Sequence, residues 1–264
     1  TWDVRDLARI EPEPGMPPSR EFGPVVQVST YADWNEFTTW WWNLIKDQRT
    51  VTAAMRAKVQ ELTTGKTTDR EKLGAIYDFV TNEIRYLAWE FGVHGYKPYD
   101  TAAIFDRRFG DCKDKALLIA AMAQEAGITV HPVLIALQGV RHQEDLSIPV
   151  VEHFNHCIAW WPGDGGTGVF LDGTATFHPA SLVPEGDRGA KVVIVQDGQA
   201  KLAQVPTGDP AQSVLETEID GKIDALGTLS AKLTATPTGL FGPELRHEFE
   251  TEADRPQQMA AWLG

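Results

Sequence analysis

The chain has 264 residues, and its 42% hydrophobic content is enough for a sizeable core in one large domain or two smaller ones. A formal net charge of −13 argues against a nucleic-acid-binding protein, because no basic surface could neutralise phosphates. The longest apolar runs, such as residues 116–123, are far shorter than the roughly 20 residues that span a bilayer, so we expect no transmembrane segment.

The first part of the chain predicts an extended lead-in followed by helices. Residues 1–30 include the proline-rich stretch EPEPGMPPS, which cannot form regular structure. Apolar side chains at helical spacing predict a helix within 30–48, and we interpret the three consecutive tryptophans at 40–42 as core packing rather than a ligand platform. A second helix, preceded by a capping box, is predicted at about 69–84, and a short one at 100–108.

The second part predicts one buried helix and then strands. The run from Cys112 to Ala126 is apolar on nearly every side, which is typical of a helix buried all round. Beyond about residue 190 the pattern changes to strands separated by Asp-Gly turns. Strands are predicted at 128–137, 152–161, 168–174, 191–205 and 213–237, and a short helix at 255–264.

These elements predict an α+β fold in which the buried helix packs on an antiparallel sheet. We expect an extended lead-in at 1–30 and a core domain at 31–190. We expect the β-rich segment at 191–264 to be the start of a further domain.

Cys112 lies at the polar start of the buried helix, just before its long apolar run. Asp111 is a good N-cap, so the thiol should lie at the positive end of the helix dipole. This position favours the thiolate, which is the nucleophilic form, and Lys113 and Lys115 should act in the same direction. The alternative is that a small cysteine fills a gap in the core.

A cysteine nucleophile needs a base, and His156 is the best candidate. His153 and His156 lie three positions apart on one predicted strand, so they should point to opposite faces of the sheet. If the two strands around PGDGG form a hairpin centred on residue 164, Asp172 lies directly opposite His156 and can accept a hydrogen bond from its ring. A slip of one residue would remove this pairing.

Other polar residues have simpler interpretations. Cys157 should face away from the site as a packed core residue, and Asp114 should form local ion pairs near the helix start. A zinc site made of Cys112, His156 and Asp172 would lack a fourth ligand, so we expect no metal. The remaining histidines for which we expect surface or loop roles are His94, His131, His142 and His178.

Three motifs together resemble the transglutaminase-like superfamily: FGDCKDKALLIAAMAQEAGI, FNHCIAW and FLDGT, within residues 70–180. The resemblance implies a papain-type thiol enzyme fold in which Cys112 is the nucleophile, His156 the general base and acid, and Asp172 the residue that orients the histidine. GDCKDKA, preceded by GYKP, is most similar to bacterial members in which this core follows another β-rich domain. The resemblance therefore implies a bacterial, periplasmic or exported protein for which calcium is not obligatory.

The expected chemistry is acyl transfer on a protein or peptide substrate without a cofactor. Cys112 would attack an amide or ester carbonyl, and backbone N–H groups at the helix start, with Trp89 or Tyr96 as side-chain candidates, would stabilise the oxyanion. The thioacyl-enzyme could then react with an amine or with water, and the residues do not decide between transamidation and hydrolysis. A noncatalytic scaffold that binds protein partners is the alternative, although it would have no need of all three residues.

Overall fold

The structure is a computed structural model, and it describes residues 23–137, 145–163 and 168–263, and before them residues 3, 5, 6, 9–11 and 13–16. The expected His142 therefore lies outside the described residues, as does the centre of the predicted hairpin turn. No helix in the described ranges is long and apolar enough to cross a membrane. The larger helices of the first part are α2 (Trp34–Ile45), α3 (Ala53–Thr63), α4 (Asp69–Glu83), α5 (Thr101–Arg107) and α6 (Cys112–Glu125).

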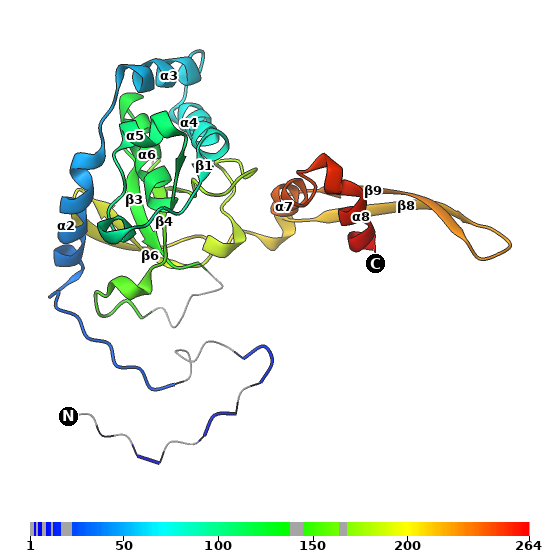
Figure 1. Cartoon of the computed structure of the whole chain (residues 1–264), viewed down its shortest axis with the longest axis horizontal. Coiled ribbons are helices and arrows are strands. Elements are labelled where there is room, and N and C mark those ends of the chain that lie inside the picture. Colours follow the sequence, from blue (N-terminus) through cyan, green and yellow to red (C-terminus); the bar gives the residue numbers. More distant parts are fainter. Residues whose placement is uncertain are drawn as a thin grey trace.

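Helix α6 is the centre of the core, packed between a sheet on one side and other helices on the other (Figure 1). It contacts strands β3 and β4 of the sheet and also α3, α4 and α5. Every residue of α6 from Cys112 to Ala123 is buried, as its all-round apolar pattern predicts. The α+β expectation is confirmed.

The sheet has five antiparallel strands in the order β5-β4-β3-β6-β7. All five strands lie within ranges that the sequence predicted as strands, although each is shorter than expected. The bounds are β3 (His131–Ile135), β4 (His156–Trp161), β5 (Val169–Leu171), β6 (Lys191–Gln196) and β7 (Gln199–Gln204).

The β4–β5 register differs from the expected one. Trp160 pairs with Phe170 and Trp161 with Val169, so the hairpin is displaced by two positions from the arrangement in which residue 156 faces residue 172. Gly168 explains the difference, because it adopts a left-handed φ of 74° where a Cβ would meet Trp160 Nε1 at 2.3 Å. The second strand therefore begins only at Val169, and Asp172 lies just beyond its end.

The start of β4 also differs from the prediction. Residues Val151–His153 form a short 3-10 helix, η4, and the strand begins at His156 rather than at residue 152. Two helices were not predicted at all, α3 and α7 (Phe241–Glu248). Helix α3 buries only Met55 and Val59, which leaves too weak an apolar stripe to find in the sequence.

The predicted helix within 30–48 is present as α2, and its aromatic side chains pack into the core as expected. Asp33 caps it by accepting from the backbone N–H of Glu36. Phe37 and Trp41 are buried, and the Trp41 indole N–H donates to the carbonyl oxygen of Tyr96. A helix in the first part of the chain is thereby tied to the segment that precedes the cysteine motif.

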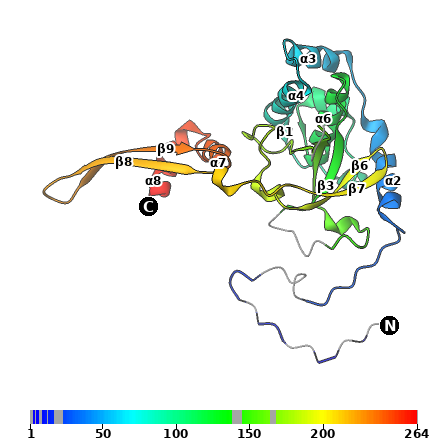
Figure 2. The same ribbon diagram turned by 180° about the vertical axis from the view of Figure 1, so that it is seen from behind.

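Strands β6 and β7 follow the expected domain boundary at residue 190, yet β6 pairs with β3 in the same sheet. The last part of the chain is a separate hairpin, β8 (Leu215–Ile223) with β9 (Leu229–Pro237), followed by α7, η7 (Glu252–Asp254) and α8 (Arg255–Leu263). Both views show this hairpin projecting away from the core (Figures 1 and 2). We propose that the further β-rich part begins with β8.

Candidate active site

The cysteine lies at the start of α6, and the sequence around it builds a capped helix end. The Asp111 carboxylate accepts from the backbone N–H of Asp114 at 3.1 Å, and the Asp114 carboxylate accepts in return from the backbone N–H of Asp111 at 3.3 Å. This reciprocal capping box fixes Cys112 as the first residue of the helix. The predicted N-cap is therefore correct.

His156 and Asp172 meet at the same end of the sheet, although they are not directly opposed across two strands. His156 is the first residue of β4 and Asp172 the first after β5, and His156 Nε2 lies 3.2 Å from Asp172 Oδ2. Both side chains are buried. The distance is that of an ion pair, but the direction of the Nε2–H bond does not meet the angular requirement of a hydrogen bond.

The surroundings of His156 favour the charged imidazolium. Burial by itself lowers the pKa of His156, but the Asp172 carboxylate and the Cys112 thiol beside the ring outweigh burial and raise the pKa to about 11. For Asp172, burial acts to raise the pKa, while His156 and the hydrogen bonds from Thr174 outweigh it and hold the pKa below its usual value. The raised pKa of His156 and the lowered pKa of Asp172 both reflect the ion pair between the two side chains. Because Nε2 faces Asp172, Nδ1 is the nitrogen left for the thiol.

Two residues next to this pair were missed by the sequence analysis. Thr174 donates to Asp172 Oδ1 through its backbone N–H at 2.8 Å and through its hydroxyl at 2.7 Å. Asp187 is fully buried, and one of its carboxylate oxygens lies within 4.8 Å of both a ring nitrogen of His156 and a carboxylate oxygen of Asp172. Asp187 lies in a 3-10 turn after the predicted hairpin, where no local pattern marks it.

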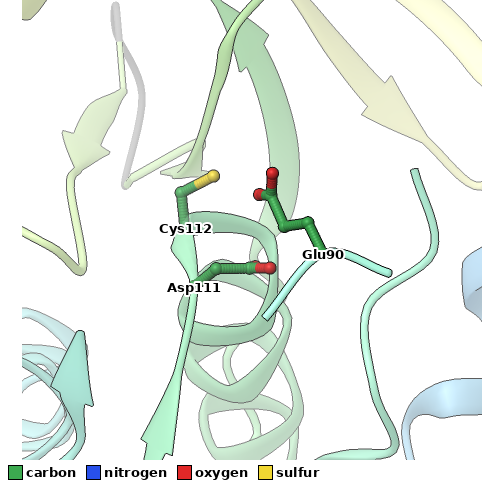
Figure 3. Close-up of side chains that lie close together, drawn as sticks. All are labelled: Glu90, Asp111 and Cys112. Atoms are coloured by element: carbon green, nitrogen blue, oxygen red, sulfur yellow. The ribbon is translucent and has the colours of Figure 1, made fainter. Parts of the chain in front are cut away.

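A segment that crosses the start of α6 brings Glu90 to the cysteine. Figure 3 shows the Glu90 carboxylate and the Cys112 sulfur above the helix end with Asp111 between their bases, and atoms of the three groups lie within 4.8 Å of one another. Lys113 Nζ bridges the two acids, donating to Asp111 Oδ2 at 2.6 Å and to Glu90 Oε1 at 3.2 Å. The charged residues of the motif thus hold this segment over Cys112.

Asp114 and Lys115 complete the buried charges near the helix start. As expected, Asp114 makes local contacts: it accepts from Arg107 Nη2 at 2.9 Å and from the backbone N–H of Tyr99 at 2.8 Å. Lys115 donates to the carbonyl oxygen of Ile84 at 2.6 Å, and burial lowers its pKa to about 8. The Lys115 ammonium, which was expected to support the thiolate, is thus engaged with a carbonyl oxygen at the end of α4.

Cys157 corrects one expectation. It is a buried core residue, as predicted, but it packs in the same cluster as Cys112 and α6 rather than facing away from them. Burial raises its pKa well above the usual value, and the neighbouring Cys112 thiol adds to this effect. The reason is the pleat of β4, which turns Cys157, Ala159 and Trp161 toward α6. Both cysteines are free thiols.

The other predicted residues fall in several places. His153 is directed elsewhere, as expected: its Nε2 lies 3.1 Å from the carbonyl oxygen of Ile148 and its ring packs beside Trp34. Trp89, half-exposed, stacks on Phe109 at 5.8 Å between ring centroids. The Tyr96 ring packs beside Trp40 of α2. An oxyanion role for Trp89 or Tyr96 stays a prediction.

Three further histidines occupy peripheral positions. His94 stacks on Tyr99, His131 stacks on Trp160 of the sheet, and His178 has Nδ1 3.2 Å from the carbonyl oxygen of Thr176. None of these contacts involves the cysteine.

Tyr86 is a further neighbour of the cysteine that the sequence did not indicate. It lies in the short strand β1 (Arg85–Tyr86), which pairs with β2 (Phe109–Gly110) directly before the cysteine motif. Burial, followed by the charges of Cys112, Asp111 and Glu90, raises the pKa of Tyr86 to about 12. Its phenol therefore stays protonated at neutral pH and is a hydrogen-bond donor near the thiol.

Two sets of side chains in the described part of the chain have metal-ligand types close together: Glu90 with Asp111 and Cys112, and His156 with Asp172 and Asp187. In the first set the Lys113 ammonium already contacts both carboxylates. In the second set Asp172 contacts His156 and Thr174. These internal partners fit an ion-pair network better than a metal centre.

A cysteine-headed helix packed against an antiparallel five-stranded sheet defines a transglutaminase-like fold. Residues 56–159 match the model of the transglutaminase-like superfamily. The fold is similar to the crystal structure of a "putative protease" from Parabacteroides distasonis, with a TM-score of 0.51 and 15% sequence identity, covering 74% of this chain and 38% of that one.

A second solved structure, a "putative cysteine protease" from Cytophaga hutchinsonii, gives a TM-score of 0.36 at 17% identity and covers 74% of this chain and 55% of that one. This chain thus spans less than two thirds of the length of either protein. No curated protein matches the sequence significantly.

Proposed function

We propose that the protein is a thiol-dependent enzyme that transfers the acyl group of a peptide-like amide through a thioacyl intermediate on Cys112. The observation that carries the proposal is the buried contact of 3.2 Å between His156 Nε2 and Asp172 Oδ2 beside a cysteine at a helix start. A core histidine without a chemical role would more simply be neutral and would need no buried carboxylate partner.

In the first half of the reaction, the Cys112 thiolate, whose proton has passed to His156, attacks the amide carbonyl carbon, and a C–S bond forms as the carbonyl oxygen becomes an oxyanion. Backbone N–H groups at the start of α6 stabilise the oxyanion, with Tyr86, Trp89 or Tyr96 as side-chain candidates. The imidazolium of His156 then gives its proton to the leaving nitrogen as the C–N bond breaks. The raised pKa of His156 suits this acid step, since the ring begins the cycle protonated.

In the second half, neutral His156 takes a proton from the incoming nucleophile, which attacks the thioester carbonyl and releases the sulfur. Water gives hydrolysis and an amine gives transamidation, and both use the same three residues. The P. distasonis protein is described as a "putative protease", and its likeness to this chain concerns the fold alone. By its family resemblance we propose that the chain acts without calcium, in the periplasm or outside a bacterial cell.

The test is acyl transfer from a glutamine-containing peptide and from a thiol-reactive peptide ester, followed by mass spectrometry with and without an added primary amine. We expect turnover by the wild-type chain and an acyl adduct on Cys112, both abolished in Cys112→Ala. A chain that binds such peptides but forms no adduct would instead be the noncatalytic scaffold.

A further inference from the structure

Strand pairing does not set the orientation of Asp172. The β4–β5 ladder ends at Leu171, and Asp172 begins a turn in which its carbonyl oxygen accepts from the backbone N–H of Ala175 at 3.1 Å. The Tyr77 hydroxyl, buried on α4, donates to the same carbonyl oxygen at 2.9 Å. The backbone of Asp172 is thus fixed from two sides, while its carboxylate needs a partner of its own.

Thr174 supplies that partner. Its backbone N–H and its hydroxyl both donate to Asp172 Oδ1, at 2.8 and 2.7 Å. With Oδ1 held by two donors, the plane of the carboxylate is set and Oδ2 is the oxygen that faces His156 Nε2. Rotation of the carboxylate would break both Thr174 bonds, each of which is a bond to a charged acceptor and stronger than a neutral one.

The turn also packs closely against α6, the helix that begins at Cys112. A Cβ added to Gly173 would lie 3.1 Å from Ile119 Cδ1 and 3.1 Å from Lys115 Cβ, both on α6. A side chain at this position would require Ile119 or Lys115 to move by a few tenths of an ångström, so glycine lets the turn approach α6 closely. The DGT sequence therefore links the orientation of Asp172 to the helix that begins at Cys112.

We propose that Thr174 is a positioning residue that acts on His156 through Asp172, fixing the ring with Nε2 toward the carboxylate and Nδ1 toward the thiol. The catalytic meaning of this inference rests on the proposed function, but the orientation of the ring does not. The other charged or titratable groups near the pair are Cys112 and Asp187 beside His156, and Lys115 and Tyr77 beside Asp172.

The test compares Thr174→Val, which removes the hydroxyl, with Thr174→Ser, which keeps it. The readout is the ¹⁵N NMR titration of the His156 ring in the full chain, which reports protonation and tautomer without any need for activity. We expect Thr174→Val to lower the His156 pKa by about one unit, a tenfold loss in proton affinity, and to mix the tautomers. We expect Thr174→Ser to titrate like the wild type.

A matched control lies in the distant β8–β9 hairpin, where Thr228 makes the same kind of contact with Asp224: its backbone N–H donates to Asp224 Oδ1 at 2.9 Å. Thr228→Val should leave the His156 titration unchanged. If Thr174→Val also left it unchanged, or if Thr174→Ser shifted it equally, the positioning role would be wrong. Thr174→Ala serves as a second hydroxyl-free variant in case the branched valine disturbs the fold.

The pH profile of Cys112 alkylation separates this inference from the proposed function. Thr174→Val should shift the part of this profile that reports His156 by the same one pH unit, with rescue by Thr174→Ser. A wild-type chain that shows the expected histidine titration but no acyl transfer would overturn the proposed function and leave the positioning role standing. An altered alkylation profile without any change in the His156 titration would overturn the positioning role.

Discussion

At the scale of single residues, the candidate site depends on the buried pair of His156 and Asp172. Either charge alone would destabilise the fold. His156 and Asp172 are each 6% exposed as side chains, so neither ion is stabilised by bulk water. The Asp172 carboxylate balances the charge of the imidazolium. Thr174 donates hydrogen bonds to the carboxylate oxygen that does not face His156. Substitution of either charged member should therefore affect both chemistry and stability.

Asp172→Asn should retain the fold but lose most activity. The amide oxygen can still accept from Thr174, but the amide nitrogen would then face His156 Nε2 with a second donor, which favours the wrong tautomer and no longer stabilises the imidazolium. In the serine-protease example the corresponding loss is about 10⁴ in rate. Steady-state turnover checks this, and His153→Ala is the control. Equal losses in both variants would contradict the assigned roles.

The raised pKa of His156 also predicts a pH dependence of stability. Because the folded-state pKa of about 11 exceeds the ordinary value of 6.5, the native chain holds a proton that the unfolded chain releases. The stabilisation of the folded chain by this proton is complete below pH 6.5 and is lost as the pH rises toward 11. Lys115, with its pKa lowered to about 8, acts in the opposite direction only above that pH.

The clearest window is therefore pH 6.5 to 8. There the free energy of unfolding of Cys112→Ala should fall relative to the double variant Cys112→Ala/His156→Gln by up to about 1.4 kcal/mol per pH unit, the cysteine being replaced so that its own proton does not cancel the effect. Urea denaturation at a series of pH values measures the difference. Parallel curves for the two proteins would mean that His156 is not held as an imidazolium.

At the scale of elements, features set by residues close together in the sequence were easier to predict than the pairing of strands. The sequence predicted α6 and its cap because Asp111 and the apolar run act within a few residues of each other. It could not predict the β4–β5 register, because the length of the turn depends on the left-handed Gly168 and its packing against Trp160. Asp187 and Glu90 reach the site from distant segments, so no spacing rule could identify them.

The start of α6 should tolerate Asp111→Asn better than Asp111→Ala. Asparagine keeps the oxygen that caps the backbone N–H of Asp114, whereas alanine loses the cap as well, at a further cost of about 1 kcal/mol. Both variants should be less stable than the wild type, because the buried Lys113 loses its nearer carboxylate partner. Urea denaturation gives the order. An Asp111→Asn chain as stable as the wild type would show that the Lys113 pair contributes nothing.

At the scale of the whole molecule, the core around α6 and the distal β8–β9 hairpin are built differently. The five-stranded sheet and α6 share one extensive core, while β8 and β9 pair with each other and leave nearly all of their residues exposed. An isolated two-stranded hairpin is only marginally stable in water. We therefore expect the core to fold without it.

Removal of residues 213–264 should leave the melting transition of the core and the alkylation rate of Cys112 unchanged. The reason is that the described sheet is complete at β7, which ends at Gln204. Circular dichroism and thermal melting measure the outcome. A truncated chain that fails to fold would mean that the hairpin supports the core in a way that its pairing does not indicate.

The central claim is that Cys112 and His156 act together as a nucleophile and its proton partner. The most direct measurement is the rate of iodoacetamide labelling at each cysteine, followed by peptide mass spectrometry, in the wild type and in His156→Gln. We predict preferential labelling of Cys112, little labelling of the buried Cys157, and a much slower Cys112 reaction in His156→Gln. Equal labelling of the two cysteines, or a Cys112 rate that does not depend on His156, would contradict the account.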